Sequence, residues 1–93
     1  MLFAWDEKKN KANIKKHGIA FETAVRVFND FNLLEIYDSE HSTPDEERWI
    51  VLGLVADILC VVFSERNETI RIISARKATK GEISEYYKNH DNR

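Results

Sequence analysis

Residues 47–75 read ERWIVLGLVADILCVVFSERNETIRIISA, and this stretch decides the fold. Apolar runs of strand length alternate in it with short breaks at 56–57 and 66–68. Both breaks suit hairpin turns, the second because Asn67 tolerates a positive φ. The pattern predicts three strands, over about 47–55, 58–65 and 69–75. Positions 58–63 are all apolar, so we expect a central middle strand that is covered on both faces.

Before these strands, the sequence predicts two helices. Asp6 is a suitable N-cap and Gly18 a suitable left-handed residue after a helix, so residues 7–17 form the first. This helix has few apolar positions and must be mostly solvated. Residues 21–30 form the second, because Phe21, Ala24, Val25 and Phe28 make an apolar stripe at helical spacing. Short strands are expected at 3–5, on a sheet edge, and at 33–37, with a polar loop over 38–46.

After the strands, Thr79 and Glu82 have the spacing of a capping box and begin a last helix over about 80–90. One face of this helix carries Ile83, Tyr86, Tyr87 and His90. The predicted fold class is therefore α+β, as a single domain over residues 1–93. It has two N-terminal helices, an antiparallel sheet meander and a C-terminal helix.

The net charge of −2 conceals three blocks of charge. Residues 1–16 carry +3, residues 17–47 carry −7 and residues 48–80 carry +3. Nucleic-acid binding needs local positive potential rather than a basic total, so the two basic blocks would supply it if they lie side by side. The alternative is that all three blocks are solvated surface.

Several classes of protein can be set aside. The first residues, MLFAWDE, have no basic region of the kind that begins a secretory signal. The longest apolar stretch, 50–63, contains Gly53 and Asp57 and is too short to span a bilayer. Cys60 is the only cysteine and cannot form an internal disulfide, so we expect a small buried side chain. These features predict a cytoplasmic protein with no membrane association.

No cofactor or metal ion is expected from the sequence. The three histidines and one cysteine have no zinc-site spacing, and glycines 18, 53 and 81 form no phosphate-binding loop. The carboxylates of residues 45–47 could bind a divalent cation, but consecutive acidic residues in a loop are more often simply solvated.

A set of segments, in fixed order and spacing, carries a family resemblance. They are 3–6 (FAWD), Lys9, Asn13, 16–18 (KHG), 21–22 (FE), Ala24, 27–28 (VF), 47–48 (ER), Gly53, 61–62 (VV), 70–79 (IRIISARKAT), Glu82 and Tyr86. On these residues the chain resembles the BrnT family of toxins over almost its full length. The family commonly has a hydroxyl residue in place of Ala20, and losing that helix cap costs about 1 kcal/mol.

The resemblance implies a RelE-like fold and a ribonuclease that inhibits translation and growth. It also implies a partner antitoxin, BrnA, whose ribbon-helix-helix domain binds the operon's own promoter. The toxin would then meet promoter DNA only through the antitoxin complex. We expect the antitoxin to cover a basic face built from residues 8–17 and 71–77.

Metal-independent RNA cleavage needs a base for the ribose 2′-OH, cations for the charged phosphorane and an acid for the leaving oxygen. His17 and Glu47 are the candidates for the base, and the sequence does not choose between them. Arg48 and Arg76 are the candidate catalytic cations, because a guanidinium donates paired hydrogen bonds to phosphate. The candidate RNA-binding residues are Lys9, Lys16, Arg71 and Lys77.

Strand periodicity limits how these residues combine. Glu47 and Arg48 should point to opposite faces of a regular strand. Arg71 and Arg76 should also point to opposite faces, so both line one site only if the strand ends before Arg76. Of the two, we favour Arg76, together with Lys77 near the entrance of the last helix.

Each candidate has a structural alternative. Lys9, Asn13 and His17 share one helix face, which could be plain solvated surface, and His17 could serve only the helix dipole. Arg48 could form a structural salt bridge. Tyr86, rather than stacking on a base, fits core packing better. Two functions therefore compete: a ribonuclease toxin, and a non-catalytic interaction module that binds a partner protein and nucleic acid.

Overall fold

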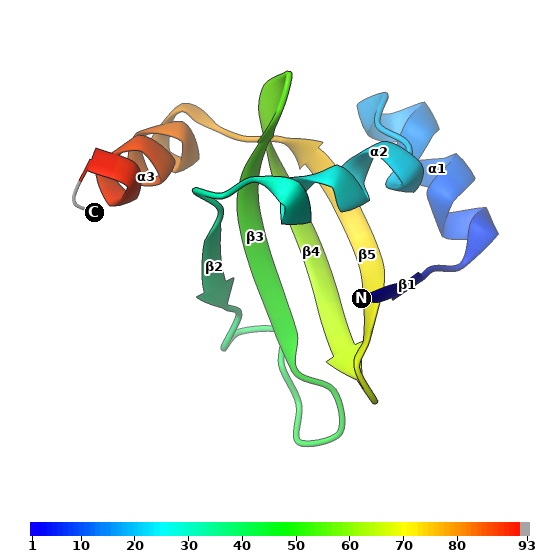
Figure 1. Cartoon of the computed structure of the whole chain (residues 1–93). Helices are drawn as coiled ribbons and strands as arrows, with labels where there is room; N and C mark the ends of the chain where they lie inside the picture. The colour runs from blue at the N-terminus through cyan, green and yellow to red at the C-terminus, as the bar shows by residue number, and fades with distance from the viewer. Residues whose placement is uncertain (92–93) are drawn as a thin grey trace.

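A computed structural model describes residues 1–91, although the side chains of His90 and Asp91 lie outside the description. The elements in chain order are β1 (Leu2–Ala4), α1 (Glu7–His17), α2 (Phe21–Ala24), the 3-10 helix η1 (Val25–Asn29), β2 (Leu34–Tyr37), β3 (Arg48–Val55), β4 (Asp57–Arg66), β5 (Thr69–Lys77) and α3 (Lys80–Asp91). The predicted α+β class is confirmed, with one sheet flanked by helices (Figure 1). None of the described helices is long and apolar enough to cross a membrane.

The sheet has five strands in the order β1-β5-β4-β3-β2. Strands β2 to β5 form the predicted antiparallel meander, and β4 is central. β1 lies at one edge, as predicted, and runs parallel to the start of β5. The sheet is therefore mixed: the N-terminal strand β1 pairs in parallel with β5, and all the other neighbouring strands are antiparallel.

Both hairpins turn where the sequence predicts. The first turns on Ala56 alone, with φ 61°, between the paired residues Val55 and Asp57, so it is tighter than the expected two-residue break. The second turns on Asn67 and Glu68, whose φ values of 52° and 67° fit a type I′ turn.

The second predicted helix is split into α2 and the 3-10 helix η1. A 3-10 turn places residues three apart on one face, and Ala24 and Val27 are both fully buried against the sheet. Gly53 of β3 permits this approach, since an added Cβ there would lie 2.7 Å from the Cβ of Val27. Close crossing of η1 over β3 thus favours the tighter turn.

Helix α1 docks through asparagine side chains rather than through an apolar stripe. Its buried residues are Asn10 and Asn13. The Asn13 amide donates to the Ala75 carbonyl at 2.8 Å and accepts from the Ala75 N–H at 3.1 Å, so it continues the edge pairing of β5 beyond β1. Asn10 Oδ1 accepts from the Phe21 N–H at 2.8 Å. The predicted polar helix is confirmed, and its polar groups are what attach it.

The two faces of the sheet are covered differently. On the helical face, α2 and η1 pack on the main core, which includes Leu59, Val61 and Phe63 of β4 (Figure 1). The other face we call the open face. At one end of it, α3 covers a smaller cluster that includes Cys60 of β4 and Tyr86. β4 is thus buried on both sides, as the apolar run predicts.

A β-bulge in β5 changes which residues share a face. Val62 pairs with Ser74 but Phe63 pairs with Ile72, so Ile73 is an extra residue. Ile70, Ile72 and Ala75 consequently all pack into the main core. The prediction that Arg71 and Arg76 must lie on opposite faces is wrong. The strand runs on to Lys77, and the bulge puts both arginines on the open face.

Helix α3 begins with the predicted capping box. The Thr79 N–H donates to Glu82 Oε1 at 2.8 Å and the Glu82 N–H donates to Thr79 Oγ1 at 3.2 Å. Tyr86 is buried, as expected of a core residue, whereas Tyr87 is about half exposed. His90 was expected on the same helix face, but its side chain lies outside the described part.

Candidate active site

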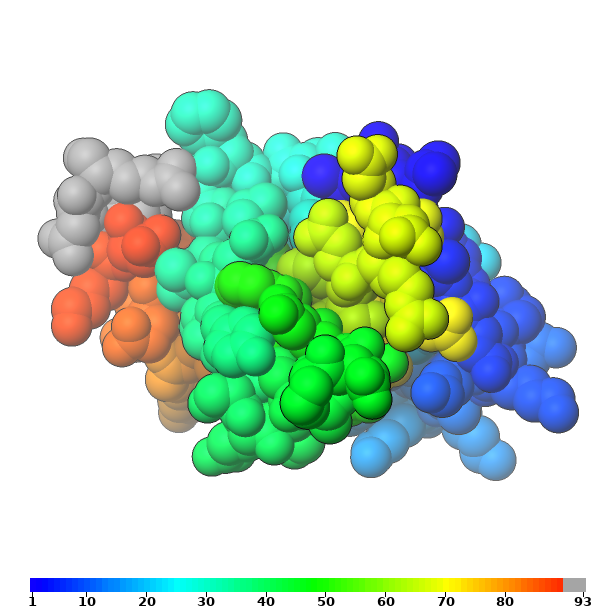
Figure 2. All heavy atoms as spheres, turned by 90° about the horizontal axis from the view of Figure 1, so that it is seen from below, coloured from blue at the N-terminus to red at the C-terminus, as the bar shows by residue number. Residues whose placement is uncertain are grey.

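A groove of about 480 Å³ occupies the end of the open face that α3 leaves uncovered. Figure 2 looks onto this end, where the loop before β3, the turn between β4 and β5 and the start of α1 meet. The lining residues are Ala4, Lys9, Asp45, Glu46, Arg48, Ser64, Glu65, Arg66, Asn67, Thr69, Arg71 and Ile73. The two basic blocks of the sequence therefore do meet, through α1 and β3 to β5.

Four cationic side chains line the groove: Lys9, Arg48, Arg66 and Arg71. Arg48 and Arg71 flank Ser64, because each pairs with it across a neighbouring strand. Two strand spacings separate their Cα atoms by about 10 Å, a span over which two arginines can hold one phosphate between them. Ser64 is only 5% exposed and forms part of the floor.

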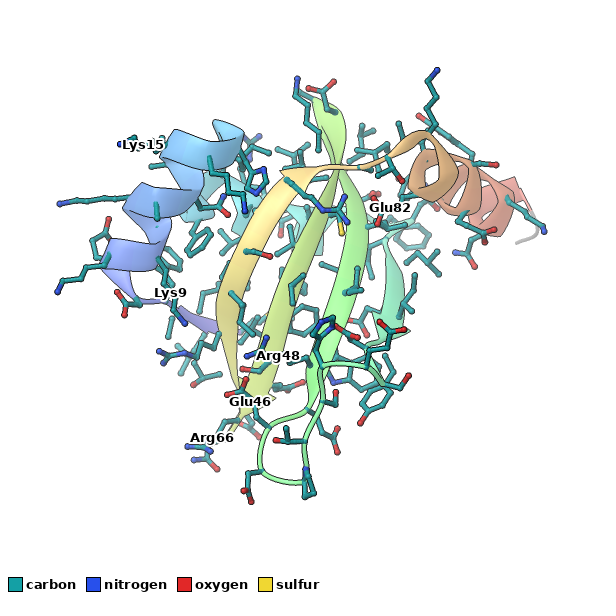
Figure 3. The ribbon with its side chains drawn as sticks, turned by 180° about the vertical axis from the view of Figure 1, so that it is seen from behind. Lys9, Lys15, Glu46, Arg48, Arg66 and Glu82 are labelled. Atoms are coloured by element: carbon teal, nitrogen blue, oxygen red, sulfur yellow. The ribbon has the colours of Figure 1, made fainter. Side chains whose placement is uncertain are left out.

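Lys9 reaches the groove because of how α1 docks. It precedes Asn13 by about one helical turn, and Asn13 is fixed to Ala75 of β5. Lys9 therefore lies alongside the earlier part of β5, next to Arg71 and Ile73. Figure 3 shows Lys9, Arg48 and Arg66 around this end of the open face.

Three carboxylates, those of Asp45, Glu46 and Glu65, share the groove with the cations. Glu46 Oε1 accepts from Arg48 Nε at 3.0 Å. This pair leaves both Nη groups of Arg48 without a hydrogen bond to any side chain or backbone group that the structure describes, so they remain able to bind an anion. The groove thus places a carboxylate directly beside a cation that can hold a phosphate.

The loop that carries Glu46 is tied to the sheet. Ser42 Oγ accepts from the Arg48 N–H at 2.8 Å, and the Asp38 N–H donates to the Arg48 carbonyl at 2.9 Å. Thr43 and Glu46 close a turn through both of their backbones. Glu46 is therefore held at a defined position beside Arg48 rather than on a free loop.

Of the eight residues expected from the sequence, three line the groove: Lys9, Arg48 and Arg71. Glu47 precedes β3 and lines a second pocket around the strand ends, with Trp49, whereas Arg48 lines the groove. His17, Lys16, Arg76 and Lys77 do not line the groove. His17 ends α1 about one turn beyond Asn13, toward the α3 end of β5.

Arg76 lies on the open face but is bound to α3. Its two Nη groups donate to the Glu82 carboxylate at 2.7 and 3.0 Å. Hydrogen bonding to Arg76 is the main reason that the pKa of Glu82 falls from 4.5 to about 2. Lys77 forms an exposed ion pair with Asp57 at 3.6 Å. Arg71 and Arg76 therefore have different surroundings: Arg71 lines the groove, and Arg76 attaches α3 to the sheet.

Neither Cys60 nor any cluster of potential metal ligands forms a site in the described part of the chain. Burial raises the pKa of the Cys60 thiol to about 11, so it behaves as the small buried side chain that the sequence predicts. Among the side chains that the structure describes, those of residues 1–89, no three His, Cys, Asp or Glu gather in a way that could hold a metal ion.

Sequence reasoning missed Glu46, Ser64, Glu65 and Arg66 as groove residues. The signal for Ser64 was present, because a hairpin folded at position 56 pairs residue 48 with residue 64. No periodicity could find Glu46, since it lies in the loop and is placed by the side-chain bonds of that loop.

The fold and the groove together define a small α+β domain that presents a basic, carboxylate-containing groove on one face of a mixed sheet. The model of the family "ribonuclease toxin, BrnT, of type II toxin-antitoxin system" matches residues 5–82, and the chain belongs to this family. Membership implies a protein antitoxin as partner and RNA as the substrate.

A solved structure supports the same assignment. The crystal structure of the Brucella abortus ribonuclease toxin BrnT is 26% identical to this chain, with a TM-score of 0.63. The match covers 86% of this chain and 100% of that one. No curated protein is similar enough to the chain to match it.

Proposed function

We propose that this chain is an endoribonuclease that cuts RNA in the groove by attack of a ribose 2′-OH on the adjacent phosphate, without a metal ion. The observation that carries the proposal is the row of Arg48, Ser64 and Arg71 across three strands, with Glu46 bonded to Arg48. Membership of a ribonuclease toxin family supports the same chemistry. We propose that the chain acts in the cytoplasm, because an RNA substrate is available there, and the α+β architecture supports a RelE-type fold.

In the proposed mechanism, the scissile phosphate lies between Arg48 and Arg71. Glu46 takes the proton of the 2′-OH, and the 2′ oxygen bonds to phosphorus to form a charged phosphorane that the two arginines stabilise. The bond from phosphorus to the 5′ oxygen then breaks. Among the groove cations Lys9 is suited to protonate that oxygen, because a guanidinium does not release its proton. The products are a 2′,3′-cyclic phosphate and a 5′-hydroxyl.

This mechanism assigns the base to Glu46 and not to His17 or Glu47. Glu46 lies in the groove and bonds the phosphate-binding arginine, whereas His17 lies at the far end of α1 and Glu47 lines the neighbouring pocket. A base must come within hydrogen-bond reach of the proton that it removes.

The antitoxin that neutralises this enzyme is proposed to be a BrnA-like protein with a ribbon-helix-helix domain, which brings the complex to promoter DNA. We propose that it covers the groove, because the groove combines cations from α1 and from β3 to β5 in one surface. A complex that cuts RNA at the rate of the free toxin would contradict this arrangement.

The test of the proposed function is incubation of the purified, antitoxin-free chain with RNA in excess chelator, followed by analysis of the fragment ends. Discrete fragments with 2′,3′-cyclic phosphate and 5′-hydroxyl ends are expected. RNA that stays intact both free in chelator and on ribosomes in a Mg²⁺-containing buffer would overturn the mechanism and favour a non-catalytic interaction module.

Three matched variants test the assignment of the base. Glu46→Gln should slow cleavage by about 10² to 10⁴-fold, while Glu47→Gln and His17→Ala should each change the rate of bond cleavage by less than about tenfold. Single-turnover rates at saturating protein measure the effect. Loss of cleavage in His17→Ala or Glu47→Gln, with Glu46→Gln active, would reassign the base.

A further inference from the structure

A second pocket of about 420 Å³ adjoins the groove at the ends of β3 and β4. It is lined by Pro44, Asp45, Glu47, Trp49, Glu65 and Arg66. Asp45, Glu65 and Arg66 also line the groove, so the two hollows are neighbours at the strand ends. A polynucleotide bound in the groove can therefore extend into the second pocket.

Trp49 gives the second pocket an aromatic wall. Its indole packs partly on the main core and partly lines the pocket. The ring of Tyr37 on β2 meets it edge-on, with centroids 5.1 Å apart, and fixes its position. Because Trp49 follows Arg48 in β3, their Cα atoms are about 3.8 Å apart and their side chains point to opposite faces.

Proteins bind single-stranded RNA by stacking bases on aromatic rings while cations follow the backbone. The second pocket has both features, since Trp49 lines it and Arg66 lines both it and the groove. It also has three carboxylates that only accept hydrogen bonds, Asp45, Glu47 and Glu65. Such acceptors suit the exocyclic amino groups of adenine, cytosine and guanine, whereas uracil has no amino group and offers them only its N3–H.

We propose that the second pocket is a base-binding subsite in which a nucleotide next to the scissile phosphate stacks on Trp49 and donates an amino hydrogen bond to Glu47. This inference rests on the proposed function, because the groove must hold the neighbouring phosphate. It makes Trp49 and Glu47 determinants of cleavage specificity, selecting an amino-bearing base over uracil.

The binding test uses short single-stranded RNA with 2′-O-methyl groups, which cannot be cut because the attacking hydroxyl is blocked. In a Trp5→Phe background, Trp49 is the remaining tryptophan, so its fluorescence reports on the subsite. Trp5 meets Phe21 edge-on, a contact that phenylalanine can keep. The expected result is quenching on binding, and about tenfold or greater weakening when one position is made abasic.

Two variants complete the test. Trp49→Leu should reproduce the weakening with normal RNA and abolish the sensitivity to the abasic position, and its circular dichroism and Tm show whether it is folded. If it does not fold, the abasic comparison on the Trp5→Phe protein decides the matter alone. Glu47→Ala, which removes the acceptor, should keep the affinity for a uracil at the subsite and lose the preference for amino-bearing bases.

The outcomes separate the subsite from the groove. RNA binding that depends on Arg71 but is indifferent to every single abasic position, with Trp49 fluorescence unchanged, would overturn the subsite and leave the proposed function intact. Failure to bind or cut any RNA would overturn both.

Discussion

Asn13 supports the sheet at the point where β1 stops. β1 pairs with β5 only as far as Arg71, and the Asn13 amide then satisfies both backbone groups of Ala75. The same side chain donates to the Ile19 carbonyl at 2.8 Å, which fixes the chain after α1. One buried amide thus closes a sheet edge, docks a helix and brings Lys9 to the groove.

We expect Asn13→Ala to destabilise the protein by about 3 kcal/mol, because it leaves two backbone groups of Ala75 buried without partners. Lys11→Ala, an exposed change on the same helix, should alter stability by less than about 0.5 kcal/mol. Urea unfolding of both variants measures the difference. Equal stability of the two would show that Asn13 does not hold α1.

Arg48 and Arg76 each form an ion pair with a glutamate, but the two pairs differ in geometry. Arg48 uses Nε for Glu46 and leaves its terminal nitrogens for a ligand, whereas Arg76 commits two terminal nitrogens to Glu82. No spacing rule distinguishes these arrangements, because the partner carboxylates come from a loop and from a helix start. The sequence could nominate both arginines but could not rank them.

Among the elements, the hairpins and helices were the most predictable, because turn residues and apolar periodicity are local signals. The bulge at Ile73 was not predicted, although the apolar alternation changes phase there, from positions 70 and 72 to positions 73 and 75. This extra residue places the side chain of Arg76 on the same face of the sheet as that of Arg71. The parallel pairing of β1 with β5 was also out of reach, because it joins segments more than sixty residues apart.

Because η1 packs closely on β3, adding one methyl group at Gly53 should destabilise the fold. Gly53→Ala should cost about 1–3 kcal/mol, because its Cβ would lie 2.7 Å from the Cβ of Val27 and 3.1 Å from its backbone carbonyl oxygen. Gly81→Ala is the matched control: its Cβ meets nothing nearer than Thr79 Oγ1 at 4.0 Å, and alanine favours the helix. Thermal unfolding should show a lower Tm for the first variant only.

The attachment of α3 predicts a dependence of stability on pH. The pKa of Glu82 is about 2 in the folded protein and 4.5 ordinarily, so the bond to Arg76 stabilises the fold above about pH 4.5. That contribution, on the order of 1–2 kcal/mol at a partly exposed pair, is lost as the pH falls from about 4.5 toward 2. Glu82→Gln should lower stability at pH 7 and flatten this part of the pH profile. Parallel profiles for the two proteins would contradict the assignment.

In the whole molecule, charge is segregated. Lys9 of α1 meets Arg48, Arg66 and Arg71 of β3 to β5 at the groove, while the other lysines of α1 do not line it. The acidic middle of the chain contributes Asp45 and Glu46 to the same groove. A net charge of −2 therefore gives no indication of the local field. The function of the chain depends on this distribution, which only the fold reveals.

The groove predicts how RNA binding depends on salt. If three phosphates are neutralised, the logarithm of the affinity should fall with a slope of about −2 against the logarithm of salt concentration, or about 100-fold for a tenfold increase. Arg71→Ala should weaken binding and reduce the slope by about 0.7. Lys15→Ala changes an exposed lysine that does not line the groove and should leave the slope unchanged (Figure 3). Titration with 2′-O-methyl RNA measures the slopes.

The central claim is that Arg71, and not Arg76, acts at the site of cleavage. Single-turnover cleavage of RNA by Arg71→Ala and Arg76→Ala, both checked for folding by circular dichroism, tests it most directly. We predict that Arg71→Ala slows cleavage by about 100-fold or more, through loss of phosphorane stabilisation, while folded Arg76→Ala cuts at nearly the wild-type rate. Cleavage lost in Arg76→Ala and retained in Arg71→Ala would move the site to the α3 end of the open face and contradict this account.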